Sequence, residues 1–139
     1  MDPRLTASEF IEALCLYREA RGESKAAKAA ILAVIRNRAA QSPKFGWPRT
    51  TTGVITQPLQ FSSFNASDPN SKVWPTTASP GSWQAWCDCC DVVLTPMTAD
   101  PTDGANHYEA IADGLPKPTW ADPEKMKIQI GKTRFYKLA

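Results

Sequence analysis

The stretch TASEFIEALCLYREARGESKAAKAAILAVIRNRAAQ, residues 6–41, decides the fold of this 139-residue chain. It contains no proline, whereas eleven of the twelve prolines fall between Pro43 and Pro123. Proline breaks helices because it lacks a backbone N–H and clashes with the preceding turn. The N-terminal third of the chain is therefore predicted to be helical, and the rest to be rich in turns.

Start and stop signals divide this stretch into two helices. Thr6 and Glu9 have the spacing of a capping box, and Gly22 interrupts the helical pattern. The apolar stripe that the first helix would bury consists of Phe10, Ala13, Leu14 and Tyr17. We therefore predict helices over residues 7–20 and 25–41.

Residues 42–81 are rich in Pro, Ser, Thr and Asn and carry aromatic residues without helical or strand period. We predict an ordered loop region here, because disordered segments are poor in aromatic residues and long loops in compact domains tend to carry binding sites. Ser82 then begins a predicted third helix that ends at Pro96, with Trp83 and Trp86 on its buried face.

The C-terminal part of the chain contains the signals of a small β element. Residues 98–110 are predicted to form a second loop. Apolar residues then alternate over 126–130, a turn follows at Gly131, and the pattern resumes at Phe135, which is typical of a hairpin. The predicted fold class is α+β, mainly α: a single domain over residues 1–139 with a small antiparallel β element at the C-terminus.

The composition excludes several kinds of chemistry. The 42% of apolar and 22% of charged residues are ordinary for a soluble globular protein. His107 is the only histidine, so a zinc site that needs two or three imidazoles is excluded within one chain, and we expect no metal and no cofactor. The net charge of +2 gives no strong basic field for nucleic acid.

The four cysteines have no spacing that identifies a site. Cys15 stands alone, and Cys87, Cys89 and Cys90 cluster without the C-x-x-C spacing of zinc or redox sites. We expect buried or half-buried free thiols, with a disulfide from Cys15 to the cluster as an open alternative. A cysteine nucleophile would have to recruit His107, and no known local signature supports it.

Two glutamates, Glu19 and Glu23, lie four residues apart at the end of the first predicted helix. At the boundary between core and cleft, Glu19 would be partly desolvated, which keeps a carboxyl group protonated as a general acid requires. Such an acid, with aromatic and amide side chains nearby, is typical of enzymes that cleave glycosidic bonds. The alternative is a solvated helix end in which Arg18 and Arg21 form salt bridges with the glutamates.

Six sequence segments, in this order, resemble one known family. The segments are LCLYREARGES, AAILAVIRNR, GVITQPLQFSSF, GANHYEA, KPTW and IGKTRFY. Together they resemble the SleB-like cell wall hydrolases, a family that includes spore-cortex-lytic enzymes and phage endolysins, over roughly residues 13–136. The resemblance implies a lysozyme-like catalytic domain that cleaves peptidoglycan between N-acetylmuramic acid and N-acetylglucosamine, typically as a lytic transglycosylase.

The resemblance also implies roles for individual residues. Glu19, the first glutamate of EARGE, would be the general acid and later the general base. The residues that would line the glycan cleft are Gln60, Phe61 and Ser62, in the QFS segment of the family, and His107 and Tyr108, in its HY segment. The tyrosine hydroxyl would bind the sugar or orient Glu19.

Two positions depart from the family pattern. Glu109 stands where a histidine is common after HY, and Thr133 stands where IGxH often has a histidine. If Glu109 reached the cleft, a second carboxylate would make a hydrolytic muramidase the alternative. A non-catalytic glycan-binding or phage structural module is an alternative from another class, and a cysteine- or zinc-dependent peptide-bond hydrolase is a third.

The cellular setting is also predicted from the sequence. The first residues lack the pattern of a signal peptide, and no apolar run reaches the length of a membrane span. We therefore expect a monomeric, endolysin-like enzyme of a phage or prophage that is made in the cytoplasm and released to the bacterial cell wall by a separate permeabilising partner. Its own partner would be the glycan strands of peptidoglycan, without nucleic acid and without stable membrane insertion.

Overall fold

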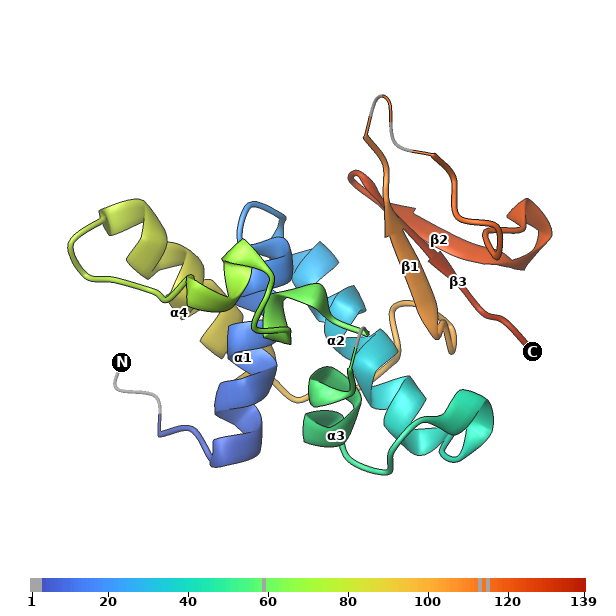
Figure 1. Ribbon diagram of the computed structural model, residues 1–139, viewed down its shortest axis with the longest axis horizontal. Coiled ribbons are helices and arrows are strands. Elements are labelled where there is room, and N and C mark those ends of the chain that lie inside the picture. The colour runs from blue at the N-terminus through green and yellow to red at the C-terminus, as the bar shows by residue number, and fades with distance from the viewer. Residues whose placement is uncertain (1–3, 59, 113, 115) are drawn as a thin grey trace.

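The described part of the chain is mainly helical and carries one small sheet (Figure 1). The computed structural model describes residues 4–139 with the exception of 59, 113 and 115. The helices are α1 (Ala7–Ala20), α2 (Lys25–Ala40), α3 (Thr51–Thr56) and α4 (Pro80–Leu94), and the strands are β1 (His107–Ala110), β2 (Met126–Ile130) and β3 (Thr133–Tyr136). Short 3-10 segments lie at Lys44–Gly46 (η1), Ser62–Phe64 (η2), Pro69–Lys72 (η3) and Pro123–Lys125 (η4). The predicted class, α+β and mainly α, is confirmed.

Helix α1 begins with the predicted capping box. The Thr6 hydroxyl accepts a hydrogen bond from the Glu9 backbone N–H at 3.1 Å, and the Glu9 carboxylate accepts one from the Thr6 N–H at 2.9 Å. These bonds satisfy backbone donors that a helix start otherwise leaves unpaired. Ser24 caps α2, which ends at Ala40, one residue before the predicted end. Both predicted helices are therefore confirmed.

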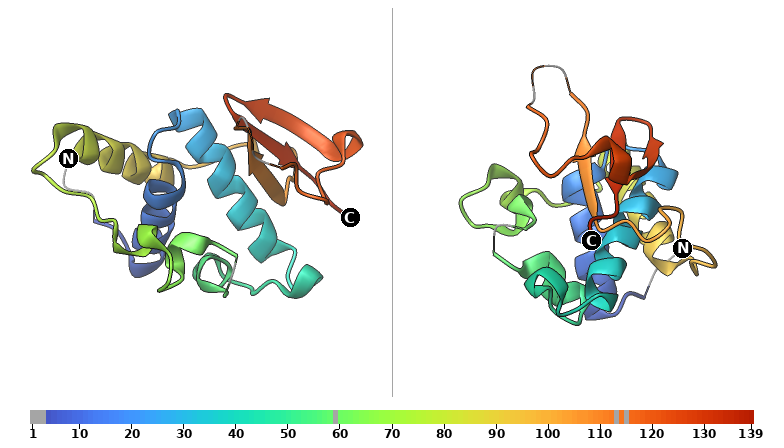
Figure 2. Two further views of the ribbon diagram at one scale, coloured as in Figure 1. Left: turned by 45° about the horizontal axis from the view of Figure 1, so that its top comes forward. Right: turned by 90° about the vertical axis from the view of Figure 1, so that its right-hand side faces the viewer.

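Helix α2 runs through the middle of the molecule. Figures 1 and 2 show α1 and α4 on one side of it and the sheet on the other. Helix α1 packs against α4 and α3, and α2 packs against α3, α4 and β1. The fully buried side chains of this core include Leu16, Leu32 and Ile35. This packing places the end of α1 that carries Glu19 beside the η2 segment.

The sheet is antiparallel, with the strand order β1–β3–β2. The predicted hairpin is confirmed: β2 and β3 are joined at Gly131, whose φ of 56° favours glycine. The prediction of a loop over 98–110 is wrong at its end, because β1 occupies its last four residues. The hydrogen-bond partners of β1 come from β3, which is distant in the sequence, so the local pattern of residues could not reveal this strand.

The region predicted to be an irregular loop also contains helices. Helix α3 is a short helix within it, capped by Thr50 through the Gly53 N–H. Helix α4 begins at Pro80, two residues before the predicted start, and Ser79 caps it. Proline fits the first turn of a helix, where its missing N–H has no partner to lose.

Two aromatic residues that were predicted to be buried are exposed. Phe10 is 38% exposed and Trp83 is 43% exposed, whereas Trp86 is buried as predicted. Each exposed ring lies at the fourth position of its helix, in a first turn, where fewer neighbours cover a side chain. Phe10 meets Trp86 edge-on, with 5.7 Å between the ring centroids.

The four cysteines are free thiols, which confirms the prediction and leaves no disulfide from Cys15 to the cluster. Burial raises the pKa of Cys89 to about 12 and that of Cys90 to about 11, and it also raises the pKa of Cys15. These thiols stay protonated at neutral pH and are poor nucleophiles, which argues against a cysteine-dependent reaction.

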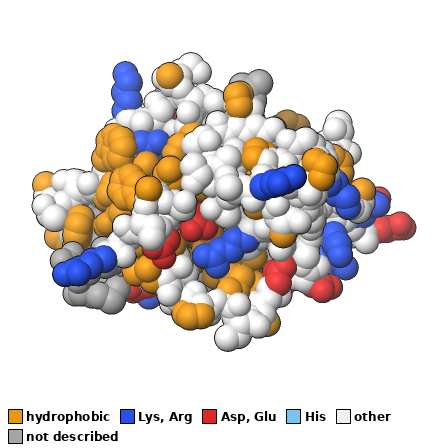
Figure 3. Space-filling view, turned by 90° about the horizontal axis from the view of Figure 1, so that it is seen from below, with side chains coloured by type: hydrophobic (Ala, Val, Ile, Leu, Met, Phe, Trp, Pro, Cys, Tyr) orange, Lys and Arg blue, Asp and Glu red, His pale blue; other side chains and the backbone are white. Residues whose placement is uncertain are grey.

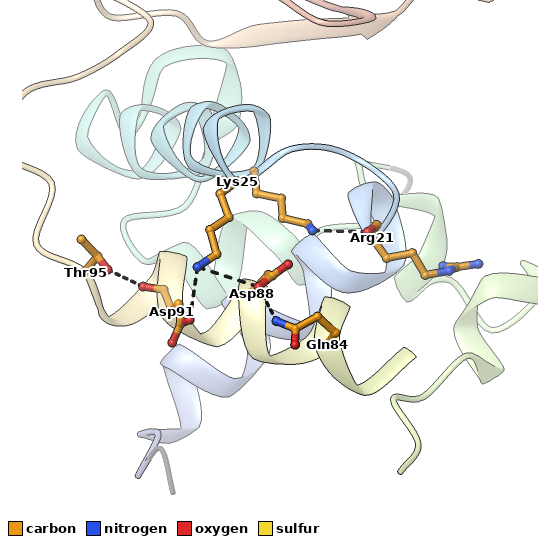
Figure 4. Close-up of polar contacts among 7 residues, drawn as sticks. Arg21, Lys25, Gln84, Asp88, Asp91 and Thr95 are labelled. Atoms are coloured by element: carbon orange, nitrogen blue, oxygen red, sulfur yellow. Dashed lines mark hydrogen bonds and ion pairs between the residues drawn. The ribbon is translucent and has the colours of Figure 1, made fainter. Parts of the chain in front are cut away.

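Charged side chains join α2 to α4 at the surface (Figure 4). The Lys25 amine lies 3.3 Å from the Asp91 carboxylate and 3.8 Å from that of Asp88. On the face shown in Figure 3, hydrophobic patches alternate with separate acidic and basic side chains. No helix of the described residues has the length and apolar character needed to cross a membrane.

Candidate active site

The candidate acid, Glu19, lies in the last turn of α1 and is half-buried. Its carboxylate accepts a hydrogen bond from the Ser63 hydroxyl at 2.8 Å. None of the ion pairs between described residues includes Glu19 or Glu23, so the interpretation of a salt-bridged helix end is wrong. Glu19 is therefore an acid at the edge of the core whose position is fixed by a neutral hydroxyl group.

The serine that contacts Glu19 is Ser63, whereas the sequence predicted a role for its neighbour Ser62. Both belong to η2, but Ser63 is buried and Ser62 is exposed. Consecutive side chains of a 3-10 helix point about 120° apart, so only one of the two can face α1. Ser62 remains a predicted glycan contact on the exposed side of the segment.

Arg18, next to Glu19 in the sequence, fixes the loop that carries Ser63. Its guanidinium donates hydrogen bonds to the backbone carbonyls of Val73, Ser63 and Ser71 at 3.0, 3.2 and 2.8 Å. The same group lies over two aromatic rings, 5.1 Å from the centroid of Phe64 and 4.7 Å from that of Trp74. Because guanidinium offers five donors in one plane, a single side chain holds three loop carbonyls. We name this set the Arg18 clamp.

A cavity of about 320 Å³ is lined by four of the five residues predicted to line the cleft. Its walls are formed by Arg38, Gln60, Phe61, His107, Tyr108 and Trp120, and we name it the Tyr108 cavity. Phe61 is buried and forms a wall, and the Arg38 guanidinium lies 5.8 Å from its ring centroid. The cavity therefore combines apolar walls with several polar groups, which is typical of ligand sites.

The wall of this cavity is linked to the candidate acid through the chain. Phe61 lines the cavity and lies two residues before Ser63, whose hydroxyl binds Glu19. Tyr108 lines the same cavity, and burial raises the pKa of its hydroxyl well above the usual value. Tyr108 therefore keeps its proton, so that its hydroxyl can donate a hydrogen bond.

His107 is held as a neutral imidazole at the cavity wall. Burial lowers its pKa to about 4, and the positive charge of Arg38 lowers it further in the same direction. Its Nδ1 lies 2.9 Å from Oδ1 of Asn106. Near neutral pH this ring carries no charge, so it can bind a ligand but cannot attract an anion.

The two other glutamates that were considered for the cleft lie elsewhere. Glu109 accepts a hydrogen bond from the Tyr136 hydroxyl and lies opposite Arg134 in the register of β1 and β3. Glu23 points toward the β2–β3 turn at Gly131. Neither glutamate is among the described residues that line the Tyr108 cavity.

Three residues of the site received no role from the sequence: Ser63, Arg38 and Trp120. Arg38 is buried and donates a hydrogen bond from Nε to the Asn106 carbonyl at 2.7 Å. Arg38 and Trp120 lie in the segments AAILAVIRNR and KPTW, which the resemblance already marked. Among the described residues no group of three or more metal-ligating side chains occurs.

The chain resembles known proteins in both sequence and structure. A model of the cell wall hydrolase family matches residues 22–136; Glu19 lies three residues before this range, and the cavity residues lie within it. The catalytic domain of the germination-specific lytic transglycosylase SleB from Bacillus anthracis is 26% identical, with a TM-score of 0.64, and the match covers 99% of each chain. The catalytic domain of the Bacillus cereus SleB protein is 27% identical, with a TM-score of 0.62, and the match covers 97% of this chain and 94% of that one.

No curated protein matches the chain significantly. The two structural matches extend over almost the whole chain, and their lysozyme-like fold is the one predicted from the sequence. The family match covers most of the chain and includes every residue that lines the Tyr108 cavity. This chain therefore belongs to the cell wall hydrolase family.

Proposed function

We propose that this chain is a lytic transglycosylase, a single catalytic domain over residues 1–139 that cleaves peptidoglycan between N-acetylmuramic acid and N-acetylglucosamine. The observation that carries the proposal is the position of Glu19: a half-buried carboxylate held by the hydroxyl of Ser63, which lies two residues after Phe61 in the wall of the Tyr108 cavity. The family and the SleB catalytic domains support the same activity.

In the first step, Glu19 acts as general acid. It donates its proton to the glycosidic oxygen while the bond from that oxygen to the anomeric carbon breaks, and positive charge develops on the sugar ring. After Glu19 has given up its proton, the Ser63 hydroxyl holds the resulting carboxylate in place.

In the second step, Glu19 acts as general base. The carboxylate removes the proton of the muramyl 6-hydroxyl, whose oxygen attacks the anomeric carbon and closes an anhydro ring. The nucleophile belongs to the substrate, so neither a water molecule nor a second carboxylate is required. The positions of Glu109 and Glu23 away from this site suit such a mechanism.

The remaining predicted residues would hold the glycan. Gln60 and Ser62 are exposed and can form hydrogen bonds with sugar hydroxyls, and Tyr108 can donate one from the wall of the cavity. Phe61 and His107 would form the walls of the cavity.

The test of Glu19 is its replacement by glutamine, Glu19→Gln, assayed on purified peptidoglycan. Glutamine has the same size and still accepts a hydrogen bond from Ser63, but it carries no acidic proton. We expect the rate of turbidity loss to fall by about 10²-fold or more, with an unchanged melting temperature. Clearing at the wild-type rate would refute the role of Glu19.

Mass spectrometry of the released fragments tests the reaction type. Anhydromuramyl ends are expected, whereas reducing muramic acid ends would establish the hydrolytic alternative. Binding to peptidoglycan without any release of fragments would favour a glycan-binding or phage structural module.

The cellular setting is a separate proposal, supported by the resemblance to phage endolysins. The enzyme would be monomeric, made in the cytoplasm and released to the wall by a permeabilising partner. Bacteria that express the chain alone are expected to remain intact, and those that also express a membrane-permeabilising protein are expected to lyse. Lysis by the chain alone would refute this setting, and light scattering of the purified protein tests the monomer.

A further inference from the structure

Two buried arginines, Arg18 and Arg38, have similar surroundings and different bonds. Each has only 8% of its surface exposed, and each guanidinium lies against two aromatic rings. Arg18 donates from Nε, Nη1 and Nη2 to three backbone carbonyls, so every nitrogen of its guanidinium has a partner. Arg18 is therefore fully used in holding the loop, and it provides the standard against which Arg38 is compared.

Arg38 uses only one of its three nitrogens. Its Nε donates to the Asn106 carbonyl at 2.7 Å, whereas Nη1 and Nη2 form no hydrogen bond or ion pair with any described residue. Among the described residues, the buried side-chain atom that lacks a partner is Oε1 of Gln57, so Nη1 and Nη2 are not sealed inside the protein. Arg38 lines the Tyr108 cavity, and through this opening its two terminal nitrogens meet solvent.

The positive charge of Arg38 has no counter-charge in the described part of the chain. None of the described residues that line the cavity is acidic, and His107 in the same wall is neutral because burial lowers its pKa to about 4. The last turn of α2 and the two ring faces offset part of the charge with dipoles. A buried cation without an anion is nevertheless costly, so the cavity favours an anionic ligand.

The geometry of the unpartnered nitrogens indicates which anion fits. Nη1 and Nη2 lie in one plane, and together they can donate to the two oxygens of a carboxylate. A carboxylate carries a single negative charge, equal to the charge of Arg38, whereas a phosphate group near neutral pH carries nearly two. The cavity of about 320 Å³ has room for such a group together with a short chain.

We propose that the Tyr108 cavity is a binding site for a carboxylate, which Nη1 and Nη2 of Arg38 hold through two parallel hydrogen bonds. The carboxylate comes from one of two sources: the peptide stem of a peptidoglycan strand, or a small organic acid in solution. The first source rests on the proposed function, whereas the site itself does not.

The first experiment measures binding to the wild-type protein with acetate as the probe. His107 is the only histidine and lines the same cavity, so its imidazole gives one set of nuclear magnetic resonance signals that report on the cavity. Near neutral pH and at constant ionic strength, acetate is expected to shift these signals along a saturating curve. So small a ligand binds weakly, so acetate is added up to about 0.1 M.

Acetamide provides the matched control, because it has the shape of acetate without its charge. At the same concentrations it is expected to leave the imidazole signals in place. The site would be overturned by an acetate response that does not saturate, or by equal responses to acetate and acetamide.

Substitutions at Arg38 test whether the guanidinium holds the probe. Arg38→Lys keeps the positive charge and loses the fork of two donors, so acetate should bind about tenfold more weakly. Arg38→Met removes the charge and should abolish the response, and Arg49→Lys, at an exposed arginine, should respond like the wild type. Melting temperatures show which variants are folded, and an unchanged response in folded Arg38→Lys would contradict the proposal even if Arg38→Met does not fold.

The source of the carboxylate is tested with two substrates, native peptidoglycan and peptidoglycan whose stem carboxylates have been converted to carboxamides. If the stem is the source, the KM of the wild-type protein should be about tenfold higher for the converted substrate, with little change in kcat. The difference should be smaller in Arg38→Lys. If a free acid is the source, both substrates should be cleaved alike, and acetate should change the rate of the wild-type protein on each.

The binding measurement requires no catalysis, so the two proposals can fail separately. Saturable acetate binding by a protein that cleaves neither substrate would refute the proposed function and support the site. Cleavage of peptidoglycan by a protein that does not bind acetate would refute the site and leave the proposed function standing.

Discussion

Two cavities formed by described residues have similar size and opposite chemistry. The Tyr108 cavity measures about 320 Å³, and a larger one of about 400 Å³ lies between α2, α4 and residues 95–101. We name the larger one the Met97 cavity, after a wall formed mainly by Ala26, Ala29, Val92, Pro96, Met97 and Pro101. Its charged residues, Lys25 and Asp91, already bind each other.

The size of a cavity alone does not identify the functional site. The walls of the Met97 cavity are largely apolar, and its charges are mutually neutralised, so it has little with which to orient a ligand. The walls of the Tyr108 cavity carry polar side chains of Gln60, His107 and Tyr108, and its residue Phe61 lies two positions before Ser63, which holds Glu19. Unpaired polar groups at fixed positions are what a specific site requires.

The largest effect is expected from removing the Arg18 clamp. Arg18→Met leaves three loop carbonyls without their donor and releases Ser63 from its position. We expect kcat to fall about 100-fold, as is usual when reacting groups move by about 1 Å, and the free energy of unfolding to fall by about 3 kcal/mol. Turnover on peptidoglycan and urea denaturation measure the two effects. Full activity in this variant would show that the loop holds its place without the clamp.

A smaller effect is expected from Ser63→Ala. It removes the hydrogen bond to the Glu19 carboxylate and keeps the backbone contact with Arg18. A hydrogen bond to a charged group contributes about 1.5 kcal/mol or more, so kcat/KM should fall about tenfold. Ser67, exposed in the same loop, provides the matched control, since Ser67→Ala should act like the wild type. Equal rates for both variants would show that Glu19 does not depend on Ser63.

The low pKa of His107, which lines the Tyr108 cavity, predicts that the stability of the protein depends on pH. The pKa of His107 is about 4 in the folded chain and near 6.5 in the unfolded one. Between these values the unfolded chain takes up a proton that folded His107 refuses, so the free energy of unfolding falls as the pH is lowered from 6.5 to 4.

His107→Gln isolates this contribution. The difference between the wild-type and variant curves cancels the carboxylates that both share, and it should fall as the pH is lowered through this window. The pKa read from the single imidazole signal should be near 4. A native pKa near 6.5 and a flat difference curve would contradict the buried neutral ring.

The smallest effect is expected in the Met97 cavity. Lys25→Met breaks the pairs with Asp88 and Asp91, which are partly exposed to solvent. Exposed ion pairs contribute little, so the free energy of unfolding should change by less than about 1 kcal/mol and the rate on peptidoglycan should stay within about twofold. A large loss of activity would break the comparison between the cavities, because it would give the Met97 cavity a part in the reaction.

The sequence predicted elements whose signals are local. The capping box of Thr6 and Glu9 and the glycine turn at Gly131 depend on residues a few positions apart, and both formed as expected. Strand β1 was missed because its four residues find their hydrogen-bond partners in β3, which is distant in the sequence. No local pattern of residues marks such a strand. Trp83 was misplaced because helical spacing defines a face but not how far the neighbouring helix covers it.

The candidate site likewise has residues that the sequence indicated and residues whose roles only the fold reveals. The resemblance selected Gln60, Phe61, His107 and Tyr108, and the fold brings them to one cavity. Spacing could not choose between two adjacent serines, because that choice depends on how η2 faces α1. Nor could it reveal that Arg18 binds backbone carbonyls, since any loop supplies such acceptors and only the folded loop presents three of them together.

The two hydrogen bonds that α1 forms with Ser63 have a mechanical consequence. Two consecutive residues of α1 hold it at two points: Arg18 holds its carbonyl, and Glu19 holds its hydroxyl. The acid and this wall of the cleft therefore form one rigid body, and thermal motion of the loop displaces both without changing the distance between them. When the cleft widens to admit or release a glycan strand, we expect the movement to occur at the opposite wall, where the sheet carries Tyr108.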